Sequence, residues 1–132
     1  MANPPETFRK SERLCSKKAI DSLFEKGISF YSYPFQIIWT KSSSDLPYPA
    51  QTAISISKRN IKSAVRRNLI KRRIREAYRK NKYRLYNFLE TNKIYIVFII
   101  IYKENKILDY HLIENAIVET INKLIASIRK KE

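Results

Sequence analysis

The sequence predicts an α/β fold, an α+β sandwich in which helices pack on one β-sheet. Three observations support this prediction. Residues 28–41 and 50–57 are rich in aromatic and β-branched residues, residues 94–102 form one continuous apolar run, and other stretches place apolar residues at helical spacing. The chain has 132 residues, which is enough for one domain with a core and too few for two of ordinary size. The expected order is helix, strand, strand, helix, strand, helix.

The domain organisation is expected to be simple. Residues 1–12 are predicted to form an extended arm in which only Phe8 and Arg9 make contacts, and residues 13–132 a single domain. The N-terminus lacks the apolar segment of a secretory signal. The longest apolar run is too short to span a bilayer as a helix. We expect a cytoplasmic protein without membrane association, and a monomer.

The first helix is predicted to begin after Ser16, whose hydroxyl suits an N-cap. It is predicted to end at Gly27, the only glycine in the chain, in the left-handed conformation that ends many helices. One face of this helix is apolar and comprises Ile20, Leu23 and Phe24.

Residues 28–41 are predicted to form one strand in which Pro34 marks an edge or a bulge. Unless a bulge swaps the faces, alternation places five residues on one face: Tyr31, Tyr33, Phe35, Ile37 and Trp39. The other face then holds Phe30, Gln36 and Ile38.

Two further strands and a final helix complete the prediction. Residues 50–57 alternate, with Ile54 and Ile56 on one face and small residues on the other. The apolar run at residues 94–102 indicates a central strand that is covered on both faces. Asp109 is a candidate N-cap for the last helix, whose predicted inner positions are Ile113, Ala116 or Ile117, Ile121, Leu124 and Ile128.

The net charge of +15 is concentrated in one segment. Residues 58–84 hold thirteen of the 27 Lys and Arg residues and a single acid, Glu76. Eight of the eleven Arg residues lie there. Because the forked, permanently charged guanidinium suits phosphate, this local enrichment indicates a polyanion site rather than general solubility.

The same segment is predicted to be helical over residues 61–82, which contain no Gly or Pro, with Asn60 as N-cap. Helical spacing gathers six polar side chains on about one face: Arg67, Lys71, Arg75, Arg79, Asn68 and Arg72. A buried stripe is predicted on a different side, at Ile70, Ile74, Ala77 and Tyr78. A shorter apolar strip is predicted near the start, at Ile61, Val65 and Leu69. A solvated face is the alternative, but such faces normally mix both signs of charge at i, i+4 spacing, and this row repels itself.

No constellation for catalysis by the protein itself is evident. The acids are scattered, and one glycine excludes a Gly-rich phosphate loop. A single cysteine excludes an internal disulfide and a Cys-rich zinc site, and Cys15 would have to meet the one histidine, His111, by chance. Exposed aromatic residues could stack on unpaired bases, although each alone is more often a core residue: Phe30, Tyr31, Tyr33 and Trp39. RNA or DNA is therefore the expected partner, and any catalytic atoms are expected to belong to that partner.

Residues 53–79 resemble the signature of the bacterial ribonuclease P protein component, in which a strand and a Lys/Arg turn lead into a basic helix. The matching positions of the helical motif are Ala64, Val65, Arg67, Asn68, Lys71, Arg72, Arg75 and Glu76. Leu69 stands where the family often has a second Arg. Residues 13–27 are similar to the family's opening helix, and the order of elements matches over nearly the whole chain.

The resemblance implies an α/β sandwich with a left-handed βαβ crossover. It also implies the small protein subunit of a ribonucleoprotein endonuclease that removes the 5′ leader from precursor tRNA. In that enzyme the RNA performs the hydrolysis and Mg²⁺ is the required ion, with no evident ligand site on the protein. The implied partners are the catalytic RNA and precursor tRNA.

Two sets of binding residues follow from the resemblance. By the resemblance, the catalytic RNA would be bound by Arg67, Asn68, Lys71, Arg72 and Arg75. The charge of the basic segment adds four residues to the predicted RNA-binding set: Lys58, Arg59, Arg66 and Arg79. The single-stranded leader would lie in a cleft between the first helix and the sheet, at Ile20, Phe24, Phe35, Ile38 and Ser55. A groove that tolerates many sequences needs apolar walls and positive charge rather than donors to base edges.

Two other classes of protein share the charge and stay open as alternatives. One is a structural ribosomal or other RNA-binding protein. The other is a DNA-binding module, which would prefer duplex DNA and show a steep dependence of affinity on salt.

Overall fold

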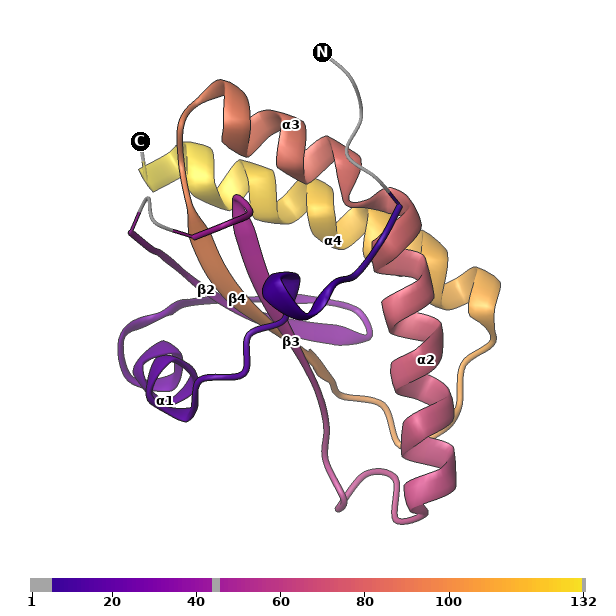
Figure 1. Ribbon diagram of the computed structural model, residues 1–132. Coiled ribbons are helices and arrows are strands. Elements are labelled where there is room, and N and C mark those ends of the chain that lie inside the picture. Colours follow the sequence, from indigo (N-terminus) through magenta and orange to yellow (C-terminus); the bar gives the residue numbers. More distant parts are fainter. Residues whose placement is uncertain (1–5, 44–45, 132) are drawn as a thin grey trace.

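The structure is a computed structural model that describes residues 6–43 and 46–131. Its centre is a four-stranded sheet in the spatial order β1 (Ile28–Ser32), β2 (Phe35–Lys41), β4 (Ile96–Tyr102) and β3 (Ala50–Ile56) (Figure 1). The β1–β2 and β2–β4 pairs are antiparallel, and β3–β4 is parallel. The apolar run therefore forms a central strand, as predicted, because β4 lies between two neighbours and is covered on both faces.

Helices cover both faces of this sheet. α1 (Lys17–Lys26) lies on one face, and α2 (Ala64–Asn81), α3 (Tyr83–Thr91) and α4 (Tyr110–Lys131) lie on the other (Figure 1). A short 3₁₀ helix, η1 (Lys10–Glu12), precedes α1. The parallel strands β3 and β4 are connected through α2 and α3, and the left-handedness of this crossover stays a prediction.

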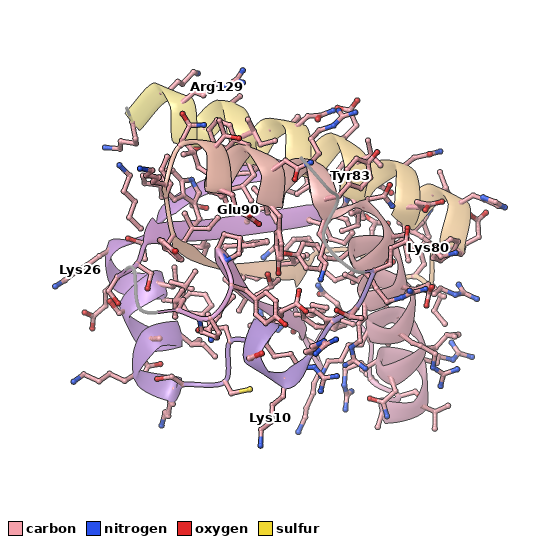
Figure 2. All side chains as sticks on the ribbon, turned by 45° about the horizontal axis from the view of Figure 1, so that its top comes forward. Lys10, Lys26, Lys80, Tyr83, Glu90 and Arg129 are labelled. Atoms are coloured by element: carbon pink, nitrogen blue, oxygen red, sulfur yellow. The ribbon has the colours of Figure 1, made fainter. Side chains whose placement is uncertain are left out.

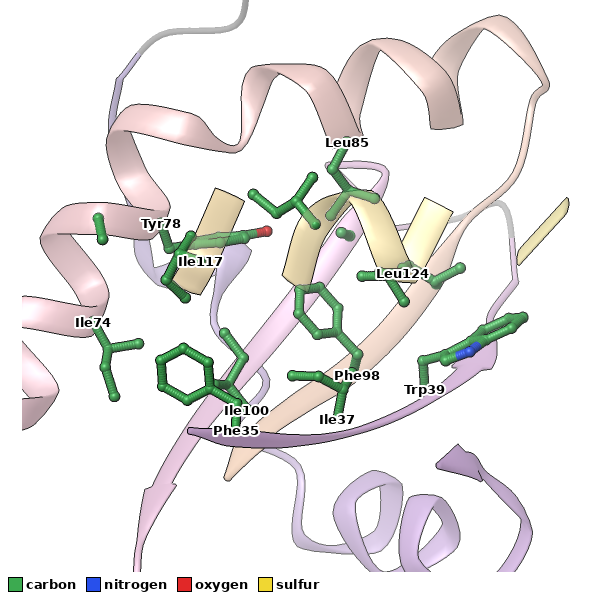
Figure 3. Packing of buried hydrophobic residues seen from close by; sticks show 14 of the residues in the cluster. Phe35, Ile37, Trp39, Ile74, Tyr78, Leu85, Phe98, Ile100, Ile117 and Leu124 are labelled. Carbon is green, nitrogen blue, oxygen red and sulfur yellow. The ribbon is translucent and has the colours of Figure 1, made fainter. Parts of the chain in front are cut away.

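The larger core lies between the sheet and the three helices. Alternation along β2 is confirmed for Phe35, Ile37 and Trp39, which all enter this core (Figure 3). They meet residues of β4 and α4, such as Phe98 and Leu124 (Figure 3). The Trp39 indole Nε1 donates a hydrogen bond to Ser127 Oγ of α4 at 2.9 Å, so its polar atom is also satisfied.

A smaller core lies between α1 and the opposite face of the sheet. It comprises Leu14, Leu23, Ile38, Val97 and Ile99. Ser16 caps α1 as predicted, since its Oγ accepts a hydrogen bond from the Ala19 amide at 3.2 Å. Helix α1 is therefore fixed at its start by the cap and along its length by apolar packing.

The prediction of one strand over residues 28–41 is wrong. Tyr33 and Pro34 form the turn of a hairpin between β1 and β2, with a cis peptide bond between them. A proline has no amide donor for a sheet, which suits it to a turn. Tyr31 and Tyr33 are 55% and 53% exposed and do not share the buried face of Phe35.

The predicted conformation of Gly27 is also wrong, because its φ is −71° and its ψ is 158°. The reason for glycine here is space. A Cβ at this position would lie 2.4 Å from Ile38 Cγ2 and 2.5 Å from the carbonyl oxygen of Leu23. Only a residue without a side chain lets the end of α1 approach β2 this closely.

The basic helix begins later than predicted, because Ser63 and not Asn60 is its N-cap. Ser63 Oγ accepts a hydrogen bond from the Arg66 amide at 3.3 Å. Ile61 is buried in the core before the helix begins and follows a turn at residues 58–60. Val65, predicted to belong to an apolar strip, is 79% exposed.

The described part of the predicted arm, residues 6–12, is not simply extended. Phe8 packs edge-on against Tyr78, with ring centroids 5.6 Å apart, so the prediction that Phe8 makes a contact is confirmed. Glu12, however, ends η1 and is buried. Residues 1–5 of the predicted arm lie outside the described residues.

Candidate nucleic-acid interface

Helix α2 has one face in the core and a cationic face outside it. The predicted stripe is confirmed, since Ile70, Ile74, Ala77 and Tyr78 are its buried residues. Apolar residues at this spacing hold the helix on the sheet. Nitrogen-tipped side chains project from the outer sides of α2 (Figure 2).

The predicted RNA-binding residues are largely accessible. Six are exposed: Lys58, Arg59, Arg66, Asn68, Arg72 and Arg75. Three are half-buried: Arg67, Lys71 and Arg79. Lys58 and Arg59 lie in the turn before α2, and the others lie on the helix, so the structure brings the set together along one element and its entry turn.

Arg67 has a second task within the protein. Its Nη1 donates hydrogen bonds to the carbonyl oxygens of Ile61 at 2.8 Å and Lys62 at 2.9 Å. These carbonyls belong to the short segment between the turn at residues 58–60 and the start of α2. Arg67 therefore fixes the start of the helix and still contributes positive charge to the outer face.

Arg79, at the end of the row, is engaged by the protein. It forms an ion pair with Glu76 and also donates to the backbone carbonyl of Glu6 at 2.6 Å. The hydrogen bond from Arg79 is the main reason that the pKa of Glu76 is lowered. Within residues 6–43 and 46–131, none of the other predicted cations forms an ion pair with a carboxylate. From Lys58 to Arg75 no described carboxylate compensates the positive charge by an ion pair.

Four of the five residues predicted for the leader cleft lie on α1 or on the face of the sheet that α1 covers. Phe24 is 58% exposed on this helix, and Ile20 is half-buried against the smaller core. Ile38 lies on the α1 face of the sheet, where it is almost fully buried, and Ser55 on β3 is half-buried. The assignment of Phe35 is wrong: it is fully buried on the opposite face, within the larger core.

The strand register places Gln36 and Ile101, which the sequence prediction did not assign to the cleft, in line with the predicted Tyr31 and Ser55. Tyr31 pairs with Gln36, Gln36 with Ile101, and Ile101 with Ser55. These four residues form one row across all four strands on the α1 face, and none of them is buried. Because such a row depends on pairing between distant strands, no local pattern in the sequence could reveal it.

The described residues offer no assembled metal site. They contain no group of three or more His, Cys, Asp or Glu side chains that could hold a metal ion. The carboxylate closest in sequence to the basic row, Glu76, is bound to Arg79. In the part of the chain that the structure covers, no helix has the length and apolar character needed to cross a membrane.

The geometry defines the chain as an α/β sandwich with a cationic face on one helix, and comparison with known proteins refines this class. The family model for Ribonuclease P matches residues 8–125. The Ribonuclease P protein component of Porphyromonas gingivalis strain W83 is 30% identical over 130 residues, 97% of this chain and 94% of the relative. That of Petrotoga mobilis is 37% identical over 121 residues, 92% of this chain and 98% of the relative. The chain belongs to the ribonuclease P protein family.

Solved structures agree on the fold. The RNase P protein of Staphylococcus aureus superposes with a TM-score of 0.64 at 24% identity, covering 87% of this chain and 95% of that chain. The RNase P protein of Thermotoga maritima superposes with a TM-score of 0.66 at 20% identity, covering 85% of this chain and 96% of that chain. The predicted sandwich of one sheet with helices packed on it is therefore confirmed.

Proposed function

We propose that this chain is the protein subunit of ribonuclease P and acts with a catalytic RNA to remove the 5′ leader from precursor tRNA. The hydrolysis belongs to the RNA, and the protein binds and positions the two RNA molecules. The observation that carries the proposal is the uncompensated cationic surface from Lys58 to Arg75 on and before α2.

The α2 surface suits the phosphate backbone of the catalytic RNA. Cations at i, i+4 spacing repel one another in the free protein. Phosphodiester groups relieve that repulsion, and release of the counterions around the RNA adds to the affinity. Exposed guanidiniums such as Arg72 and Arg75 can each bind a phosphate through two donors.

The face beside α1 suits the single-stranded leader. Phe24 and Tyr31 are exposed aromatic rings, and Gln36, Ile101 and Ser55 continue the row across the sheet. Aromatic and aliphatic surfaces bind unpaired bases of any sequence through stacking and apolar contact. This face therefore supports binding of a leader without strict sequence preference.

Mg²⁺ enters the proposal as an ion of the holoenzyme. The described residues offer no cluster of ligands for it. The protein's contribution to the chemistry is instead electrostatic: the cationic helix lowers the repulsion between two polyanions, which the metal would otherwise have to screen.

Reconstitution with the cognate ribonuclease P RNA tests the proposal. Substituting Arg72→Gln and Arg75→Gln together removes two exposed cations that make no ion pair among the described residues. We expect cleavage of precursor tRNA to fall roughly tenfold at low Mg²⁺ and to recover as Mg²⁺ rises. A matched control, Lys123→Gln with Lys130→Gln on α4, removes the same charge and is expected to cleave normally.

Two outcomes would contradict this assignment. If the Arg72 and Arg75 double variant cleaves normally across the Mg²⁺ titration, α2 is not the RNA-binding surface. If sequencing of RNA that co-purifies with the protein yields ribosomal RNA rather than ribonuclease P RNA and precursor tRNA, the structural RNA-binding alternative is correct.

A further inference from the structure

A second cationic groove lies between α3 and α4, on the side of the sheet opposite α1. It has a volume of about 490 Å³ and is lined by Arg84, Phe88, Asn122, Ile125, Ala126 and Arg129. A smaller hollow continues it past Arg84 toward Tyr83 and Val118. Figure 2 labels Tyr83 on α3 and Arg129 on α4, near the two ends of this surface. None of the residues that line either hollow is an acid.

Arg84 is held in place by a neutral partner. Its Nη1 donates a hydrogen bond to Asn122 Oδ1 of α4 at 2.8 Å. The amide fixes the orientation of the guanidinium without cancelling its charge. The other nitrogen donors of Arg84 are therefore positioned for a further acceptor, and the side chain is exposed.

Arg129 is held in a comparable way at the other end of the groove. Its guanidinium carbon lies 5.2 Å from the centroid of the Phe88 ring, which is a cation–π contact. An aromatic face orients a guanidinium and leaves its in-plane donors free. Position 129 also suits the negative end of the α4 dipole, but that role needs neither the aromatic contact nor arginine in particular.

The described part of the chain does not compensate the charges of this groove. Across the described residues, neither Arg84 nor Arg129 forms an ion pair with a carboxylate. Two oriented guanidiniums beside an apolar floor of Phe88, Ile125 and Ala126 match a ligand with spaced phosphates and apolar edges between them. A sugar–phosphate backbone has this chemistry.

We propose that the α3/α4 groove is a second RNA-binding site, which takes the sugar–phosphate backbone of a segment other than the one on α2. The inference rests on the proposed function, because it takes from that function that the partner is an RNA. The sheet separates this groove from the leader-binding face beside α1 (Figure 1), so a leader held there cannot also fill the groove. The occupant is therefore a different stretch of RNA, and the ribonuclease P RNA is the probe to use.

Directed cleavage of the RNA backbone tests where each surface lies. The exposed Cys15 is first replaced by Ser, and a single cysteine is introduced by Ala126→Cys in the groove or by Val65→Cys on α2. Each is loaded with a tethered iron chelate that generates hydroxyl radicals, and complexes with the ribonuclease P RNA are mapped. We expect two separate sets of cuts, one from each position.

The outcomes separate this inference from the proposed function. Cuts from position 65 alone would overturn the groove as an RNA site and leave the proposed function standing. The absence of cuts from both positions would count against both.

Substitution provides an independent measurement. Replacing Arg84→Gln and Arg129→Gln is expected to weaken binding of the ribonuclease P RNA roughly tenfold and to lower the salt dependence, d log K/d log[salt], by about 1.5 in magnitude, because two phosphate contacts are lost. The control Lys123→Gln with Lys130→Gln removes equal charge from α4 residues that do not line the groove. An equal loss in both pairs, or no loss in the arginine pair, would overturn the proposal. So would a change of oligomeric state on sedimentation, since the groove would then belong to a second copy of the chain.

Discussion

The carboxylate of Glu12 forms an ion pair with the ammonium of Lys82 inside the protein, although 70 residues separate them in the sequence. Both side chains are almost fully buried. Tyr86 Oη donates a second hydrogen bond to the same carboxylate at 2.6 Å. Because Lys82 stands between α2 and α3, this pair ties the N-terminal segment to the end of the basic helix. The orientation of α2, which carries the proposed RNA-binding surface, therefore depends on a contact outside that surface.

Substituting Glu12→Gln is expected to lower the free energy of unfolding by about 3 kcal/mol, since it leaves the Lys82 ammonium buried without a counterion. Chemical denaturation of the isolated protein measures this change. Glu25→Gln on the exposed part of α1 is the matched control and is expected to change the stability by less than about 0.5 kcal/mol. Equal effects of the two substitutions would mean that the buried pair does not stabilise the fold.

The same contact predicts a dependence of stability on pH. Burial by itself would raise the pKa of Glu12, but hydrogen bonds from Lys82, Tyr86 and the Arg9 amide outweigh it and hold the pKa below 4.5. A carboxyl whose pKa is lower in the folded state stabilises the protein above its unfolded pKa and loses this contribution as the pH falls through the folded value. We expect the difference in unfolding free energy between the wild type and Glu12→Gln to shrink below pH 4.5. A difference that stays constant down to pH 3 would contradict the assignment.

Much of the fold could be predicted because helical spacing and N-caps involve residues that lie close together in the sequence. The stripe of Ile70, Ile74 and Ala77 follows the helical repeat, and the structure buries all three. Asp109 caps α4 as predicted, since its Oδ1 accepts a hydrogen bond from the Leu112 amide at 2.9 Å. The cationic face of α2 could be predicted for the same reason, because all its members lie on one helix and the turn before it.

Features that depend on tertiary contacts could not be predicted in this way. Phe35 and Ile38 are three positions apart. Because side chains alternate between the two faces of a regular strand, residues an odd number of positions apart lie on opposite faces. The cleft implied by the resemblance combined them, and the structure confirms the alternation instead. The Glu12–Lys82 pair left no signal in the sequence, because a buried charge and an exposed one look alike until their partners are known.

The two roles of Arg67 can be separated by comparison with Arg72. Substituting Arg67→Ala removes the hydrogen bonds to the carbonyls of Ile61 and Lys62. We expect it to lower both RNA affinity and, by about 2 kcal/mol, the stability. Arg72→Ala, at an exposed position, is expected to lower RNA affinity alone. RNA filter binding together with thermal unfolding measures both effects, and an unchanged melting temperature for Arg67→Ala would show that the contacts to the carbonyls are dispensable.

The close approach at Gly27 predicts that even a methyl group is too large. Gly27→Ala would place a Cβ against Ile38 Cγ2 and the backbone carbonyl of Leu23, and the carbonyl can yield only if α1 shifts. We expect a loss of about 1–3 kcal/mol in unfolding free energy. Ser22→Ala, on an exposed part of the same helix, is the control and is expected to be neutral or slightly stabilising. Equal stability of both variants would show that the end of α1 adjusts freely.

Two phenylalanines that the resemblance placed in one cleft are expected to differ in what their substitution by alanine changes: RNA binding for Phe24 and stability for Phe35. Phe24 is 58% exposed, so Phe24→Ala should leave the fold almost unchanged and weaken binding of a precursor tRNA with a single-stranded leader. Phe35 is fully buried in the larger core, so Phe35→Ala should cost about 3–5 kcal/mol of stability. Chemical denaturation measures the loss of stability in Phe35→Ala. The effect of Phe24→Ala on leader binding is measured in the reconstituted holoenzyme, by comparing affinities for precursor tRNA with and without the leader. If Phe24→Ala weakens binding of both RNAs equally, the exposed ring does not contact the leader, and the α1 face has another role.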